Sequence, residues 1–216
     1  MMGRKTYSLF SLVLVLGLVS SSYGVLIADF EGSLDGFYTD TWTEGTVSQS
    51  TIGATSGTGS MLCEAPGGWK QVAKTDIRSI REFLGTPGVE ITADVTSFAA
   101  DMTGGWAEVM MVINAQNYDD DGDPSNNIGW NQLNLVAMDR SGVPQAMSWP
   151  IPADLSAKIA GSNDGIDWFE LLIISNTEDA AGSVGKFYID NINAVPEPAT
   201  IALLGMGGLA LLRRRR

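Results

Sequence analysis

The 216-residue sequence contains no histidine and a single cysteine, Cys63. Without histidine the chain has no Ser-His-Asp triad, no histidine-ligated metal and no imidazole to act as a general base at neutral pH. A lone cysteine forms no disulfide within the chain, and we expect Cys63 to be a buried structural thiol. The folded state must therefore be stabilised by an apolar core, to which a bound metal ion can add.

Positive charge is scarce as well. The chain has 13 Lys and Arg residues against 25 Asp and Glu residues, a net charge of −12. Six of the cationic residues lie near the two ends, so residues 25–195 hold 7 cationic and 24 acidic residues and carry a net charge of −17. Such an anionic surface opposes binding to nucleic acid and to anionic lipids. It suits a soluble exported protein and attracts divalent cations.

The sequence also lacks an apolar run of the roughly 20 residues that an ordinary membrane-spanning helix needs. The C-terminal run, residues 199–212, has 14 uncharged, mostly apolar residues and includes three glycines. It follows Pro196-Glu197-Pro198 and precedes a terminal cluster that consists of Arg213, Arg214, Arg215 and Arg216. Two interpretations fit this tail: a short anchor that stays in the membrane, or a targeting signal that is removed.

The first 24 residues are typical of a secretory signal peptide. Arg4 and Lys5 form a short basic region and residues 9–19 are apolar. Ser22 and Gly24 then place small residues at the −3 and −1 positions of a cleavage site. We expect cleavage before residue 25, with an uncleaved N-terminal anchor as the alternative.

Taken with this signal peptide, the Pro-Glu-Pro motif, the short apolar segment and the terminal arginines resemble the PEP-CTERM sorting signal. The resemblance implies an exported protein of a Gram-negative bacterium, destined for the cell surface or the extracellular matrix. It also implies transient inner-membrane insertion through the C-terminal helix and recognition by the membrane peptidase exosortase. The predicted organisation is a signal peptide over 1–24, a β-domain over 25–195 and a sorting tail over 196–216.

The segment between the two signals has the pattern of an all-β domain, because short alternating runs are separated by turn-forming residues. Residues 89–96, 106–114 and 130–138 alternate most clearly. The side chains expected to face the core are Val89, Ile91, Ala93, Val95, Ala107, Val109, Met111, Ile113, Leu133, Leu135 and Ala137. Residues 168–174 are almost continuously apolar, as in a strand that is covered on both faces.

The remaining pattern completes the fold prediction. Residues 25–31 and 187–190 are the expected first and last strands, and short helical turns are expected over 76–84 and 153–160. Many short strands, long loops and few helices predict a two-sheet jelly-roll β-sandwich.

The two ends of the domain resemble the first and last strands of jelly-roll carbohydrate-binding modules. The opening motif is Asp29-Phe30-Glu31-Gly32, and the closing motif is Phe187-Tyr188-Ile189-Asp190-Asn191-Ile192. Phe37 stands where these families usually have tryptophan. The resemblance implies a sandwich that binds polysaccharide without catalysis.

The same resemblance implies a structural Ca²⁺ ion held by Glu31 and Asp190. Carboxylates from the first and last strands are hard oxygen ligands, and the chain has no disulfide to join those strands. The alternative is that Asp190 caps a turn with Asn191. A second acidic segment, residues 117–123, opens like an EF-hand loop, but Ile128 replaces its final glutamate. This segment is either a solvated turn or a loose Ca²⁺ site.

The outward positions of the alternating strands carry the candidate binding residues. They are Glu90, Thr92 and Asp94 on the first strand, and Trp106, Glu108, Asn114, Trp130, Gln132 and Asn134 on the other two. Sugars pack their C–H faces on aromatic rings and pair their hydroxyls with amides and carboxylates. We therefore predict a carbohydrate site made of Trp106, Glu108, Asn114, Trp130, Gln132 and Asn134. The alternative is that a loop covers both tryptophans and extends the core.

The other four tryptophans distinguish less clearly between a binding site and the core. Trp42, Trp69 and Trp149 lie in turn-rich sequence, where an exposed ring can add to a binding surface, and Trp168 begins an apolar run that suits the core.

Three function classes follow from these patterns. We favour an exported, non-catalytic polysaccharide-binding protein. A purely structural matrix protein is the first alternative. A jelly-roll glycoside hydrolase or lyase is the second, and its carboxylate pair would come from Glu90, Asp94 and Glu108.

Overall fold

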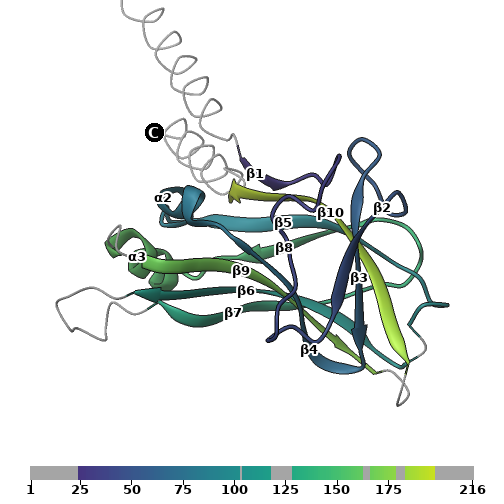
Figure 1. Cartoon of the computed structure of the whole chain (residues 1–216). Coiled ribbons are helices and arrows are strands. Elements are labelled where there is room, and N and C mark those ends of the chain that lie inside the picture. Colours follow the sequence, from purple (N-terminus) through teal and green to yellow (C-terminus); the bar gives the residue numbers. More distant parts are fainter. Residues whose placement is uncertain (1–23, 103, 118–127, 163–165, 179–182, 198–216) are drawn as a thin grey trace, which may run out of the picture.

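Figure 1 shows a computed structural model of the chain, in which two antiparallel β-sheets pack face to face. It describes residues 24–102, 104–117, 128–162, 166–178 and 183–197. The predicted signal peptide, the acidic segment from residue 118 onward and the sorting tail beyond residue 197 lie outside the described residues. Within them, the predicted all-β, two-sheet jelly-roll sandwich is confirmed.

Sheet A runs in the order β2-β3-β10-β5-β8, with β1 also paired to β10. Its strands are β1 (Val25–Ala28), β2 (Thr46–Ser50), β3 (Ser60–Pro66), β5 (Val89–Ser97), β8 (Gln145–Pro150) and β10 (Val184–Pro196). The first half of β10 pairs with β3 and its second half pairs with β1, and its register to β5 shifts between Asp190 and Asn193. Both ends of the domain are thereby joined in one sheet.

Sheet B runs in the order β4-β9-β6-β7. Its strands are β4 (Gly68–Asp76), β6 (Ala107–Asn117), β7 (Gly129–Ala137) and β9 (Ile166–Thr177). The short helices are the 3₁₀-helix η1 (Arg78–Ile80), α2 (Arg81–Leu84) and α3 (Ala153–Gly161). Figure 1 shows α2 and α3 at the same end of the sandwich, where the Arg81 guanidinium donates to the Ser162 hydroxyl at 2.9 Å.

The core fills the space between the sheets. Every predicted inward residue of β5 and β6 is buried, and Cys63 is buried as expected. The largest fully buried side chains include Trp149, Phe30, Phe169, Phe187, Met111, Ile113 and Leu171. Burying one large apolar side chain contributes roughly 1.5–3 kcal/mol. Packing of aliphatic and aromatic side chains therefore stabilises the folded state of this domain, which has no disulfide bond.

The prediction that Leu135 and Ala137 face the core is wrong. A β-bulge places two residues of β7, Leu133 and Asn134, opposite the single residue Met111 of β6. Beyond a bulge the alternation of a strand reverses. Leu133 is therefore buried, whereas Leu135 is 39% exposed and Ala137 is also exposed.

Several predicted elements differ in extent. The first strand ends at Ala28 because the chain turns at Phe30, where φ is +56° and the Asp35 carboxylate accepts the Phe30 N–H at 2.7 Å. The two helical turns form where expected. The sequence prediction missed β2, β3, β4 and β8.

Candidate functional site

The side of sheet B that faces away from the core, here called the outer face, is built from four rows of side chains. Read across β4, β9, β6 and β7, the rows are Asp76-Glu170-Asn114-Trp130, Lys74-Leu172-Val112-Gln132, Gln71-Ile174-Met110-Leu135 and Trp69-Asn176-Glu108-Ala137. Between the two middle rows β4 and β7 each advance by three residues instead of two, from Lys74 to Gln71 and from Gln132 to Leu135. The cause is an irregularity in the register of each strand.

The outer face has an apolar floor of its own. Met110 and Val112 of β6 pack with Leu172 and Ile174 of β9 in a buried cluster that is separate from the main core. This explains the continuous apolar run in β9, since both faces of that strand are covered, as predicted. Polar and aromatic side chains border the floor at both ends.

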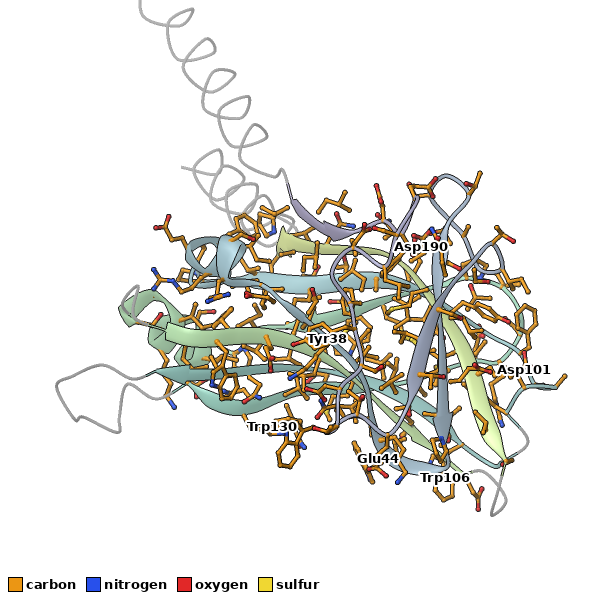
Figure 2. All side chains as sticks on the ribbon, in the orientation of Figure 1. Tyr38, Glu44, Asp101, Trp106, Trp130 and Asp190 are labelled. Atoms are coloured by element: carbon orange, nitrogen blue, oxygen red, sulfur yellow. The ribbon has the colours of Figure 1, made fainter. Side chains whose placement is uncertain are left out.

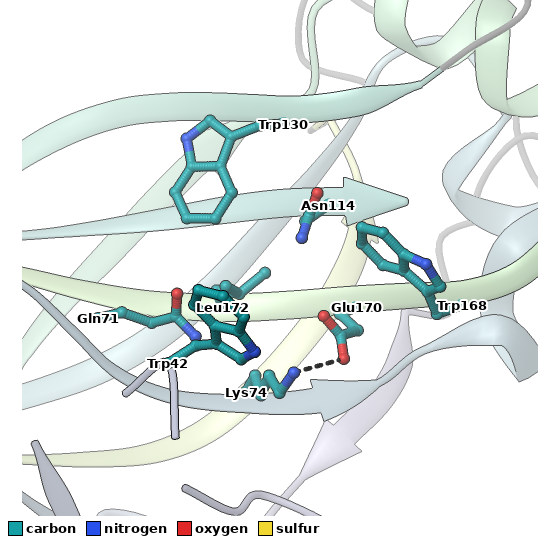
Figure 3. Close-up of a pocket in the computed structure, with 8 residues that line it drawn as sticks. All are labelled: Trp42, Gln71, Lys74, Asn114, Trp130, Trp168, Glu170 and Leu172. Carbon is teal, nitrogen blue, oxygen red and sulfur yellow. Dashed lines mark ion pairs between the residues drawn. The ribbon is translucent and has the colours of Figure 1, made fainter. Parts of the chain in front are cut away.

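An open cleft of about 620 Å³ lies over one end of this floor. Its lining consists of Trp42, Gln71, Lys74, Asn114, Trp130, Trp168, Glu170 and Leu172. Figure 3 shows Trp130 and Trp42 on opposite sides of the cleft, with Trp168 at one end and Leu172 behind Trp42. Three indoles from three separate segments thus surround amide and carboxylate groups on an apolar base.

Trp42 reaches the cleft from the loop that precedes β2. The backbone of Tyr38 pairs with Lys74 of β4, and the Glu44 N–H donates to the Gln71 carbonyl at 2.9 Å. Between these anchors, one oxygen of Asp40 accepts the Trp42 N–H at 2.8 Å. The Trp42 residue is 79% exposed. Backbone hydrogen bonds, more than side-chain packing, therefore hold this indole at the cleft.

Lys74 ties that loop to the sheet. Its Nζ lies 2.8 Å from the Asp40 carboxylate and 2.9 Å from that of Glu170, and it sits 5.5 Å from the centre of the Tyr38 ring. Burial acts to lower the pKa of Lys74, but its hydrogen bonds to the two carboxylates outweigh burial and raise the pKa. The hydrogen bond from Lys74 is the largest cause that lowers the pKa of Asp40. Lys74 therefore stays protonated between the two carboxylates.

The predicted carbohydrate residues share the outer face but fall into two groups. Asn114 and Trp130 line the cleft, and Gln132 is exposed in the next row. Trp106 and Glu108 lie toward the other end of β6, and Figure 2 shows Trp106 well apart from Trp130 along the sheet.

The two tryptophans are not covered. Trp106 and Trp130 are each 48% exposed, so the alternative that a loop buries both is wrong. Asn134 is exposed within the β7 bulge.

The outward residues of β5 belong to the other sheet. The Glu90 carboxylate accepts a hydrogen bond from the Ser148 hydroxyl, and Asp94 accepts one from Thr55 at 2.6 Å. The grouping of Glu90, Thr92 and Asp94 with the tryptophan strands is therefore wrong. Glu108 lies on sheet B, across the core from Glu90 and Asp94, so it pairs with neither of them.

Sequence reasoning did not assign six cleft residues: Trp42, Gln71, Lys74, Trp168, Glu170 and Leu172. Gln71 and Lys74 belong to β4, which was not predicted. The alternation of Trp168, Glu170 and Leu172 was hidden by the apolar residues between them. Trp42 carried only the general signal of an aromatic residue in a turn.

Glu31 and Asp190 both bind the loop at residues 55–59. Glu31 Oε1 accepts the N–H groups of Thr58 and Gly59, both at 2.7 Å, and these hydrogen bonds, Gly59 first, lower the Glu31 pKa. Asp190 is fully buried and accepts the Thr55 N–H at 2.6 Å.

These carboxylate oxygens face amide donors, whereas Ca²⁺ requires oxygen ligands. Among the described residues no three acidic or cysteine side chains gather as a metal site. A shared ion would have to compete with these N–H groups for the carboxylate oxygens. Calcium binding by Glu31 and Asp190 stays a prediction, which a melting temperature unchanged by EDTA would contradict.

The C-terminus matches a known family model. Residues 194–216 match the PEP-CTERM protein-sorting motif, which indicates export and surface sorting. Of the predicted sorting residues, Pro196 and Glu197 are described, and Pro196 ends β10 in register with Val89. No helix in the described ranges is long and apolar enough to cross a membrane.

Solved structures share the fold of the domain. The CBM22-1 xylan-binding domain of Paenibacillus barcinonensis Xyn10C has a TM-score of 0.51 and 13% identity, with 80% of this chain and 95% of that chain covered. The CBM22-1-GH10 modules of Clostridium thermocellum Xyn10B, complexed with xylohexaose, have a TM-score of 0.53 and 12% identity. In that case 81% of this chain and 28% of the other are covered.

The curated proteins contain no sequence that matches this chain. At such low identity the structural likeness concerns the fold alone. The protein thus carries a PEP-CTERM sorting motif after a jelly-roll β-sandwich whose fold is similar to that of carbohydrate-binding modules.

Proposed function

We propose that this exported protein binds a neutral polysaccharide, without catalysis, in the cleft of sheet B. The observation that carries the proposal is the convergence of Trp42, Trp130 and Trp168 on one open cleft that amide groups also line. Indoles that stay partly or largely in water in such a group serve a ligand better than they serve the core.

The chemistry of the cleft suits a sugar chain. The C–H face of a pyranose ring can stack on an indole, and its hydroxyls can pair with the amides of Asn114 and Gln71. Because Trp130 and Trp42 lie on opposite sides of the cleft, a ring held between them contacts aromatic surface on two sides.

The charges favour a neutral ligand. Lys74 is the cationic residue in the lining, and it is already paired with the carboxylates of Asp40 and Glu170. The surrounding domain carries a net charge of −17 over residues 25–195. A polysaccharide rich in uronic acids would be repelled, and the described part of the cleft lining offers it no cation that is not already paired.

The absence of catalysis is part of the proposal. Among the described residues that line the cleft, Glu170 is the one carboxylate, and it is paired with Lys74. Glycoside hydrolysis normally uses two carboxylates about 5 Å or about 6.5–9.5 Å apart.

We infer the cellular context from the sorting motif. Exosortase is the proposed partner during export, with transient membrane insertion through the tail, and the cell surface or the matrix is the proposed destination. The xylan-binding domain of Paenibacillus barcinonensis Xyn10C, which shares the fold, supports the choice of xylan as a first probe.

A panel of immobilised polysaccharides tests the proposal. Xylan, mannan and β-glucan represent neutral chains, and alginate represents an acidic chain. The purified protein should be retained by at least one neutral polymer and not by alginate, and Trp130→Ala should abolish retention without lowering the melting temperature. Val143→Ala, at an exposed site away from the cleft lining, is the control. Retention by none of the neutral polymers, or retention unchanged in Trp130→Ala, would overturn the proposal.

A further inference from the structure

A second group of aromatic and polar side chains lies at the opposite end of the outer face. Asn176 of β9 stands between Trp69 of β4 and Glu108 of β6 in one row, and its Nδ2 donates to Glu108 Oε2 at 2.7 Å. Trp106 follows the same alternation two residues before Glu108, and its carbonyl accepts the Glu178 N–H at 3.0 Å. We call Trp69, Trp106, Glu108 and Asn176 the distal patch.

The distal patch repeats the chemistry of the cleft. Two indoles, one 54% and the other 48% exposed, flank an amide and a carboxylate that already share a hydrogen bond. None of its four residues lines the cleft. Because so much indole surface is left in water, packing of the core does not account for the two tryptophans.

The two sites lie along one line of the sheet. Asn114 in the cleft and Glu108 in the distal patch are six residues apart on β6, which is about 20 Å at the rise of a β-strand. The rows between them present Gln71, Gln132 and the partly exposed Leu135 beside the apolar floor. In Figure 2 Trp130 and Trp106 mark the two ends of this track on the same side of sheet B.

The cleft is oriented along that track. Trp130 stands on its β7 side and Trp42 on its β4 side, so the space between them runs parallel to the strands (Figure 3). Trp168 lies at the end of the cleft that faces away from the distal patch. A polymer that leaves the cleft at the other end meets Asn176 and the two indoles.

We propose that the distal patch is a second sugar subsite, and that a single extended polysaccharide chain runs along the strands from the cleft to Trp69 and Trp106. This inference rests on the proposed function, because it assumes that the cleft binds sugar. It adds the direction of the chain and makes affinity depend on chain length.

A length series of oligosaccharides tests the inference by titration calorimetry. The probes are xylo-oligosaccharides from dimer to octamer, together with the corresponding manno- and cello-oligosaccharides. Affinity should rise with length and level off only when the chain spans both sites. The double variant Trp69→Ala/Trp106→Ala should lower the affinity for the longest oligomers about tenfold and leave that for the shortest ones unchanged.

The controls separate this subsite from the cleft and from folding. Trp130→Ala should weaken the binding of short and long oligomers alike. Trp69→Phe/Trp106→Phe should keep most of the dependence of affinity on oligomer length. Unchanged binding of short oligomers by the double alanine variant shows that it is folded.

Equal affinity of the wild-type protein for short and long oligomers would overturn the distal subsite while leaving the proposed function intact. Equal losses for all lengths in the double alanine variant would also overturn it. If the wild-type protein binds none of the three series at any length, the proposed function fails, and the subsite fails with it.

Discussion

Replacing Lys74 with methionine should destabilise the protein and loosen the Trp42 side of the cleft. Methionine keeps the length of the side chain but removes the cation between Asp40 and Glu170. The two carboxylates then face each other without a counter-charge, and Asp40 loses the contact that ties its loop to β4.

The expected cost follows from the burial of the group. The Lys74 side chain is 13% exposed, and those of Asp40 and Glu170 are 26% and 13% exposed. Breaking a fully buried ion pair costs about 3–5 kcal/mol, and exposed pairs are worth about 0–1 kcal/mol. For this partly buried group we expect a loss of about 2 kcal/mol in the free energy of unfolding at pH 7.

The dependence on pH sharpens the prediction. Because Lys74 lowers the pKa of Asp40, its stabilising effect is full above the ordinary aspartate pKa and disappears as the pH falls through the lowered value. In Lys74→Met the carboxylates repel each other until one takes up a proton. The difference in stability between wild type and variant should therefore shrink as the pH is lowered from 7 toward 3.

Urea unfolding at several pH values measures this difference. Lys70→Met is the matched control, because Lys70 lies on the same strand as Lys74 and pairs with Glu44, whose side chain is 56% exposed. The control should lose no more than about 1 kcal/mol. A Lys74→Met protein as stable as Lys70→Met, or a difference that grows at low pH, would refute the reasoning.

Three further predictions concern the framework of the sandwich. Asp190→Asn should cost about 2–4 kcal/mol of unfolding free energy, because the buried carboxylate accepts backbone N–H groups that an amide nitrogen would repel; urea unfolding that shows no loss would contradict this. Burial raises the pKa of the Cys63 thiol, so a thiol reagent at pH 8 should modify it only after unfolding, and rapid labelling of the native protein would count against the buried position. The β7 bulge predicts that Leu133→Ser costs at least about 2 kcal/mol and Leu135→Ser under about 1 kcal/mol, and the reverse order in thermal unfolding would contradict the register.

The predictable part of the fold is the part with uninterrupted alternation. The strand around Ile91 could be read from the sequence because its side chains alternate between buried and partly exposed along most of its length. In the strand around Val109 the inward side chains could be read as well, although Met110 and Val112 on the outer face are also buried. In β4 the irregularity puts two successive residues, Val72 and Ala73, in the core, which removes the period-two signal. The bulge in β7 reverses the pattern after Leu133 in the same way.

The residues of the site also differ in whether local sequence could predict them. Trp130 and Asn114 could be found because they lie at outward positions of regular strands. Trp42 could not be assigned, because tertiary contacts bring its loop to the cleft: backbone hydrogen bonds to β4 and the ion pair between Asp40 and Lys74, which are far apart in sequence. The distance between Trp106 and Trp130 could not be predicted either. It depends on the register between β6 and β7, which local sequence does not specify.

The central claim, that the tryptophan cleft binds a neutral polysaccharide, is tested most directly by the six tryptophan indole resonances in a ¹H–¹⁵N NMR spectrum. Addition of whichever neutral oligosaccharide binds in the length series should shift the indole signals of Trp42, Trp130 and Trp168. The fully buried Trp149 is the internal control and should not move. Unperturbed cleft indoles at saturating xylo-, manno- and cello-oligosaccharide, or shifts no larger than that of Trp149, would contradict the account.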